Sequence, residues 1–236
     1  MKVPSNAAVG VRLLAQDRPG LSLIRRVRAQ RLTYLSPAAL SDLRRRMQEL
    51  EQGRVVGSVI EAGCALGGSA IVLAASKTKA RPMYVYDVFG TIPPPSDADG
   101  EDTLRRYEEI VAGRSKGIGG DTYYGYEENL QAKVRASFAQ FGLAVNEHNV
   151  HLIQGLFQDT IRPDGPVALA HIDGDWYDSV KVCLERIWPR LIVGGVVVID
   201  DYDDWSGCRT AVDEFLGDRT DFCAERWSRL HLVKLN

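Results

Sequence analysis

Aspartates follow two strongly apolar runs of the sequence, and their number and spacing indicate metal chemistry. Asp173 and Asp175 come after the first run, and Asp200 and Asp201 come after the second. Such runs are typical of buried parallel strands, whose carboxyl ends meet at one rim of a sheet. Two carboxylates about 4 Å apart repel by roughly 4 kcal/mol at an effective dielectric of about 20, so the cluster needs a compensating charge. With no cysteine nearby, these oxygen ligands favour a hard cation such as Mg²⁺.

A glycine-containing segment, Glu61 to Ser69, follows the first expected strand and opens a helix. In a doubly wound fold this is the nucleotide site: Gly63 permits a tight turn, and the helix N-terminus offers free N–H groups. The spacing is not G-x-G-x-x-G, and an acid at the strand end suits the ammonium group of an aminoacyl cofactor. S-adenosylmethionine is therefore favoured over NAD, with expected contacts from Glu61, Ala62, Gly63, Cys64 and Ser69.

Further cofactor contacts are expected at the ends of the neighbouring strands. Asp87 ends the strand expected at 83–87, where a carboxylate can accept hydrogen bonds from ribose hydroxyls. After the strand expected at 150–154, Phe157 is available to pack on the adenine and Asp159 to make a polar contact. Asp159 is equally suited to begin a helix. Asp173 is expected to serve both the cofactor and the metal.

The elements that position these residues alternate along the chain. The strands are expected at 55–61, 83–87, 150–154, 167–173 and 195–200, with helices at 37–52, 69–77, 179–188 and 208–216 and a terminal strand pair at 222–226 and 230–235. Alternation of this kind predicts an α/β fold with a doubly wound Rossmann-like sheet, which binds ligands at the carboxyl ends of its strands. The terminal pair is expected to form an antiparallel edge.

Residues 88–148 interrupt this alternation with a segment far longer than the roughly 2 to 6 residues of an ordinary strand-to-helix loop. The segment holds Pro93-Pro94-Pro95 and the glycines of 117–120, which supply hinges, together with several aromatic residues suited to lining a pocket. A helical lid over the site is the favoured interpretation. The alternative is a helical subdomain whose aromatics form an ordinary core.

Composition narrows the class of partner. Lys and Arg number 29 against 31 Asp and Glu, and the formal net charge of -2 gives no general attraction to nucleic acid or to an anionic membrane. The 4 cysteines are scattered, which suggests neither a zinc site nor a disulfide framework, and no apolar run approaches the roughly 18 residues that span a bilayer. We expect a cytoplasmic protein with a small-molecule partner. Its amphipathic N-terminal arm, residues 1–35, is expected to pack on the body or on a second subunit of a homo-oligomer.

The motifs together resemble the macrocin O-methyltransferase family, whose members use S-adenosylmethionine and Mg²⁺ to methylate sugar hydroxyls in antibiotic biosynthesis. The resemblance runs from about Arg31 to Val233 and is carried mainly by the blocks 173–179 and 194–202, with shorter blocks at 61–69, 87–89 and 155–160. It implies a class I methyltransferase domain at 54–236, with the lid at 88–148, preceded by an arm and helix at 1–53.

By this resemblance Asp173, Asp200 and Asp201 are the metal ligands, and Asp175 is the general base that takes the proton from a sugar hydroxyl. A sugar hydroxyl is a poor nucleophile near neutral pH, and a bound cation lowers its pKa. Where family members carry a bulky aromatic and an arginine, this chain has Cys64-Ala65-Leu66, so the contacts of those side chains do not carry over.

Other functions compete with this reading. A catechol-type cation-dependent O-methyltransferase uses similar acids on the same fold, and an NAD-binding oxidoreductase or a non-catalytic oligomeric partner is less favoured. His171 lies in an expected buried strand and is interpreted as a core histidine rather than a catalyst.

Overall fold

The computed structural model describes residues 17–236, so the first part of the expected N-terminal arm, residues 1–16, lies outside the described part. The remainder of the arm forms α2 (Arg18–Ala29), whose first turn is capped by the Asp17 carboxylate, which accepts a hydrogen bond from the Gly20 amide at 3.0 Å. Helix α3 (Pro37–Gln52) begins in the expected place because the Ser36 hydroxyl accepts from the Ala39 amide at 3.1 Å.

The centre of the fold is a 7-stranded sheet with the order β3-β2-β1-β4-β5-β7-β6. Its strands are β1 (Ser58–Ala62), β2 (Met83–Asp87), β3 (Val150–Gln154), β4 (Val167–Ile172), β5 (Leu191–Ile199), β6 (Phe222–Arg226) and β7 (Leu230–Lys234). The first five run parallel, and β7 pairs antiparallel with both β5 and β6. The predicted α/β Rossmann-like sheet with an antiparallel edge is therefore confirmed.

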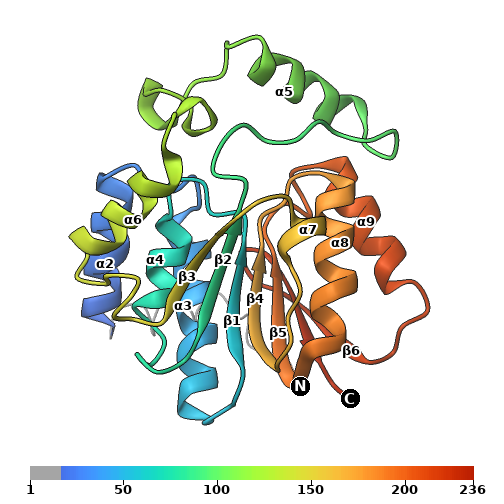
Figure 1. The fold of residues 1–236 in the computed structure, drawn as a ribbon. Helices are drawn as coiled ribbons and strands as arrows, with labels where there is room; N and C mark the ends of the chain where they lie inside the picture. The colour runs from blue at the N-terminus through green and yellow to red at the C-terminus, as the bar shows by residue number, and fades with distance from the viewer. Residues whose placement is uncertain (1–16) are drawn as a thin grey trace, which may run out of the picture.

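Helices cover both faces of this sheet (Figure 1). One face is covered by α2, α3, α4 (Gly68–Ala74) and α6 (Leu130–Gln140). The other face is covered by α8 (Tyr177–Ile187) and α9 (Ser206–Leu216). Side chains of the strands point alternately to the two faces. In β1, for example, Val59 points to the first face and Ile60 to the second, and both are fully buried. Among residues 17–236 no helix is both long and apolar enough to cross a bilayer.

The long insertion divides into two parts. Helix α5 (Glu101–Val111) and the short 3-10 turns Ile118–Gly120 and Tyr124–Tyr126 belong to the segment that arches above the carboxyl ends of the strands (Figure 1). Helix α6 is instead part of the body, because Leu130, Val134 and Phe138, spaced four residues apart, are fully buried in the core of the first face. The lid is thus shorter than the expected 88–148, and we use the term for residues 88–129.

Candidate active site

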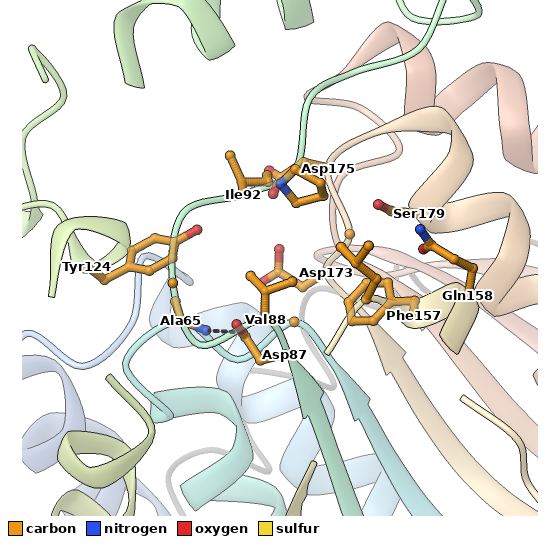
Figure 2. A pocket seen from close by; sticks show the side chains of 15 residues that line it. Ala65, Asp87, Val88, Ile92, Tyr124, Phe157, Gln158, Asp173, Asp175 and Ser179 are labelled. Atoms are coloured by element: carbon orange, nitrogen blue, oxygen red, sulfur yellow. Dashed lines mark hydrogen bonds between the residues drawn. The ribbon is translucent and has the colours of Figure 1, made fainter. Parts of the chain in front are cut away.

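A cavity of about 570 Å³, part of it open to solvent, lies at the carboxyl ends of β1, β2 and β4 beneath the lid (Figure 2). This is where a doubly wound sheet binds its ligands. Residues from the sheet rim, the lid and α8 line it: Gly63, Ala65, Asp87, Val88, Gly90, Ile92, Pro93, Tyr124, Leu156, Phe157, Gln158, Asp173, Gly174, Asp175 and Ser179. Tyr124 lies on one side of the cavity and Phe157 on the other, with Asp173 between them (Figure 2).

Asp87 organises the loop after β1. Its Oδ2 accepts hydrogen bonds from the backbone amides of Cys64 at 2.8 Å and Ala65 at 3.2 Å, and its Oδ1 accepts from the Phe89 amide at 2.7 Å. Burial raises the pKa of Asp87, and these N–H donors oppose the shift. A carboxylate has about four lone-pair sites, so Asp87 retains acceptor capacity toward the cavity that it lines.

Two of the expected cofactor residues face away from the cavity. The Glu61 side chain is fully buried under the first helical layer, where it accepts from the Ser69 hydroxyl and contacts His171 Nδ1 at 3.1 Å. Neither Glu61 nor Ser69 lines the cavity, and Ala62 and Cys64, which were also expected to contact the cofactor, do not line it either. The loop therefore presents mainly Gly63 and Ala65 to a ligand.

After β3 only part of the expected contact surface faces the cavity. Phe157 and Gln158 line it, whereas Asp159 does not and lies in the first turn of the short helix α7 (Phe157–Thr160). Ser179 of α8 also lines the cavity and was not expected from the sequence. A serine three residues into a helix has no sequence signature that separates it from an ordinary surface residue.

Three carboxylates converge at the cavity. Ligand oxygens of Asp173, Asp175 and Asp201 all lie within 4.8 Å of one another. Burial, followed by repulsion from the neighbouring acids, holds the pKa of Asp173 and of Asp201 well above the usual range. Burial also raises the pKa of Asp175, to about 6. The cluster thus carries a concentration of negative charge that a cation would relieve.

Asp200, the remaining expected ligand, has a positively charged neighbour of its own. Arg229 Nε donates to Asp200 Oδ1 at 2.7 Å, while Arg229 Nη2 reaches Asp200 Oδ2 only at 3.5 Å. Burial raises the pKa of Asp200, but the neighbouring His171 and the hydrogen bond from Arg229 outweigh this effect and lower the pKa. Asp200 therefore remains ionised beside the three converging acids but is not one of them.

Two tryptophans surround Asp175, and neither was singled out from the sequence. Trp205 Nε1 donates to Asp175 Oδ1 at 3.0 Å, and the rings of Trp176 and Trp205 meet edge to face at 5.7 Å. The Asp175 amide donates to Asp201 Oδ2 at 3.1 Å. Asp175 itself has φ of 52°, a left-handed conformation that is uncommon outside glycine and is often found at functional sites.

The lid is tied to the body at several points. Trp176 Nε1 donates to the carbonyl of Pro93 at 2.9 Å, and Asp99 and Asp102 accept from the backbone amides of Tyr177 and Ser206, each at 2.9 Å. These two amides lie at the N-termini of α8 and α9, where a carboxylate is favoured. These contacts anchor the segment 88–129 to the N-termini of two helices of the body.

Aromatic rings form the lid side of the site. Tyr123 and Tyr124 lie with centroids 4.4 Å apart, and Tyr34, from the segment between α2 and α3, meets Tyr124 at 6.3 Å. Arg106 of α5 lies over the Tyr123 ring at 5.5 Å, and its charge opposes the raised pKa of Asp175. This wall of Tyr34, Tyr123, Tyr124 and Arg106 is called the aromatic wall below.

Comparison with known proteins identifies the family. Residues 7–220 match the macrocin-O-methyltransferase (TylF) family. The enzyme 8-demethyl-8-(2,3-dimethoxy-alpha-L-rhamnosyl)-tetracenomycin-C 4'-O-methyltransferase of Streptomyces olivaceus is 32% identical over 215 residues, which cover 87% of this chain and 72% of that protein. Demethyldecarbamoylnovobiocin O-methyltransferase of Streptomyces niveus is 28% identical over 194 residues, covering 78% of this chain and 67% of that protein.

Solved structures agree on the fold. The structure of the O-methyltransferase NovP matches with a TM-score of 0.71 at 23% identity, covering 87% of this chain and 83% of that chain. The family match spans most of the chain, including every strand of the parallel sheet and the acids at its rim. The chain therefore belongs to the macrocin-O-methyltransferase family and is an O-methyltransferase.

Proposed function

We propose that this enzyme transfers a methyl group from S-adenosylmethionine to a sugar hydroxyl of a glycosylated natural product, assisted by Mg²⁺. The observation that carries the proposal is the convergence of Asp173, Asp175 and Asp201 within 4.8 Å beside a cavity at the carboxyl ends of the parallel strands. The relatives described above are named as O-methyltransferases of a rhamnosyl-tetracenomycin and of demethyldecarbamoylnovobiocin, and the rhamnosyl group in the first name supports a glycosylated acceptor.

The cavity fits the proposed cofactor. Asp87 lies where ribose hydroxyls would donate to a carboxylate, and Phe157 presents a ring where the adenine would lie. The turn at Gly63 brings backbone close to the cavity without a side chain, which suits the aminoacyl end of the cofactor. Glu61 supports this turn from beneath, through Ser69, rather than by contact with the cofactor.

The acid cluster fits a hard divalent cation. We assign Asp173, Asp200 and Asp201 as its ligands, since oxygen-only donor sets are those that Mg²⁺ prefers. Asp200 is included because its Oδ2 has only a 3.5 Å contact with Arg229 and is thus available. When bound, the cation would lower the pKa of an acceptor hydroxyl and orient it.

Asp175 is assigned as the general base. The hydrogen bond from Trp205 orients its carboxylate, and its pKa of about 6 leaves it mostly ionised near pH 7.5, ready to accept a proton. The rest of catalysis would be alignment: residues at the sheet rim would hold the acceptor hydroxyl next to bound S-adenosylmethionine, which would supply the methyl group and leave as S-adenosylhomocysteine. The lid limits access of water to this step.

The proposal predicts a metal-dependent methyl transfer. With S-adenosylmethionine as donor, rhamnosyl conjugates are expected to be methylated, activity to fall at least about tenfold in EDTA, and Mg²⁺ to restore it. Catechols and nucleotide sugars are tested in parallel, with product detected by mass spectrometry. Activity that is unaffected by EDTA contradicts the metal assignment, and a preference for catechols over every glycoside contradicts the sugar acceptor.

The aromatic wall is predicted to bind the acceptor. Arg106→Gln is expected to raise the acceptor KM about three- to tenfold, because Arg106 packs on Tyr123 and its charge acts on Asp175, while leaving the affinity for S-adenosylhomocysteine unchanged. The matched control is Arg105→Gln, which alters the exposed neighbour on the same helix. An equal KM for both variants and the wild type would exclude Arg106 from acceptor binding.

A further inference from the structure

A line of buried polar side chains crosses the sheet beneath the active site. Glu61 of β1 lies in register with His171 of β4, so both side chains point to the face covered by α3 and α4. Glu61 Oε2 contacts His171 Nδ1 at 3.1 Å, and His171 Nε2 faces Asp200 Oδ1 at 3.7 Å. The line therefore joins the strand before the cofactor loop to the end of β5.

One end of this line of polar side chains lies beside the cofactor loop, and the other lies at Asp200, next to the acid cluster. Ser69, in the first turn of α4 directly after the cofactor loop, donates to Glu61. At the other end, Arg229 donates to Asp200 at 2.7 Å. Glu61 and His171 are both 0% exposed, and burying a charged pair costs several kcal/mol of desolvation per ion. An apolar pair would fill this space at lower cost, so stability alone does not account for these residue types.

His171 has one polar neighbour left for its second nitrogen. Within residues 17–236, His171 Nε2 is buried without a hydrogen-bond partner, and the Asp200 carboxylate is the group that it faces. Since Nδ1 is held by Glu61, the imidazole ring cannot turn without breaking that contact. The orientation of the ring thus determines where a donor to Asp200 is placed.

We propose that His171 is a positioning residue for the cation site: clamped by Glu61, it orients the Asp200 carboxylate, and so couples the cofactor loop to the metal-binding rim. The inference rests on the proposed function, since it gives Asp200 a role as ligand. It replaces the interpretation of His171 as an ordinary core histidine.

Two substitutions of different side-chain length test the contacts of His171 with Glu61 and with Asp200 one at a time. In His171→Asn the amide can reach the position of Nδ1, next to Glu61, but not that of Nε2, next to Asp200. In His171→Gln the longer amide retains a donor toward Asp200. His171→Asn removes the polar contact of Nε2 with the Asp200 carboxylate at 3.7 Å, so we expect it to weaken Mn²⁺ binding about tenfold, and His171→Gln to weaken it by much less. Binding is measured by electron paramagnetic resonance of Mn²⁺, without acceptor.

His231→Asn is the matched control. His231 lies in the same row of the sheet, beyond Val198, and is also 0% exposed, but its Nδ1 accepts from Arg46 and it touches none of the rim acids. We expect this variant to lose thermal stability while retaining wild-type Mn²⁺ affinity. Glu61→Gln, which keeps the shape but removes the charge of the clamp, is expected to weaken Mn²⁺ binding about threefold.

These experiments distinguish failure of the positioning role of His171 from failure of the proposed function. Failure of the wild type to bind Mn²⁺ overturns the proposed cation site, and the inference with it. If the wild type binds Mn²⁺ and His171→Asn binds it equally well, only the positioning role is overturned. Equal weakening in His171→Asn and His231→Asn also overturns it, since the loss would then reflect general damage to the core. Recovery of His171→Asn turnover at high Mg²⁺, with an unchanged KM for S-adenosylmethionine, supports it.

Discussion

The Asp201→Asn variant is expected to lose methyl-transfer activity by about 100-fold or more at a Mg²⁺ concentration that half-saturates the wild type. Asp201 is 6% exposed and lies in the converging acid cluster, so its charge acts on a cation across a poorly solvated gap. One charge at about 4 Å is worth roughly 4 kcal/mol at an effective dielectric of about 20, and about 1.4 kcal/mol corresponds to a tenfold change in affinity. Activity and Mn²⁺ affinity should therefore fall together.

Asp175→Asn is expected to lower methyl-transfer activity strongly while changing Mn²⁺ affinity much less. Removing a general base costs about 10²- to 10⁴-fold in rate, whereas a residue that does not ligate the cation should change Mn²⁺ affinity by less than about tenfold. Trp205 can still donate to the amide oxygen, so the side chain is expected to remain in place. If Asp175→Asn loses Mn²⁺ as fully as Asp201→Asn, while Asp200→Asn retains it, the three converging acids are themselves the ligand set.

The neighbouring acid Asp203 provides the control for both variants. It belongs to the same acidic stretch but is exposed and paired with Arg226 at 2.7 Å, away from the cluster. Asp203→Asn removes the same charge from the same loop, and exposed pairs of this kind contribute only about 0 to 1 kcal/mol. Wild-type activity and Mn²⁺ affinity are expected. A large loss in this variant would show that the overall charge of the loop, rather than the cluster, governs activity.

The sequence predicts the rim of the sheet well because parallel strands bring their carboxyl ends together whatever lies between them in the chain. Asp87, Asp173 and Asp201 are therefore found near one cavity, as expected. It is harder to predict to which face of the sheet a side chain at the end of a strand points. Glu61 is a strand residue facing the helical layer, and its polar partners, Ser69 and His171, are recognisable only once the strand register is known.

Contacts made by distant segments account for most of what sequence reasoning missed. Arg229 reaches Asp200 because β7 returns antiparallel beside β5, and local patterns do not specify which strand lies beside which. Trp205 reaches Asp175 across the ends of β4 and β5 in the same way. The lid boundary was misplaced for a related reason: α6 has an apolar face, but only the tertiary fold shows that this face joins the main core.

Gly63→Ala is expected to disrupt the site more severely than any substitution of a lining side chain. Gly63 has φ of 87°, and a Cβ atom added to it would lie 1.8 Å from the backbone oxygen of Asp173. Left-handed backbone costs an alanine about 1 to 2 kcal/mol, and overpacking adds about 1 to 3 kcal/mol. We expect unfolding by urea to show a loss of about 3 kcal/mol or more, with weaker binding of both S-adenosylhomocysteine and Mn²⁺.

Gly142→Ala is the control that measures the free-energy cost of left-handed backbone without a steric clash. Gly142 has a similar φ of 72°, but nothing lies within 4 Å of a Cβ added there, so only the left-handed cost of about 1 to 2 kcal/mol applies. The clash at Gly63 is with the backbone of Asp173, directly after β4, so relieving it must move the Gly63 turn, Asp173 or both. A change in the cofactor loop is therefore expected to reach the acid cluster. Equal destabilisation in the two variants, with ligand binding intact in Gly63→Ala, would show that the two halves of the site move independently.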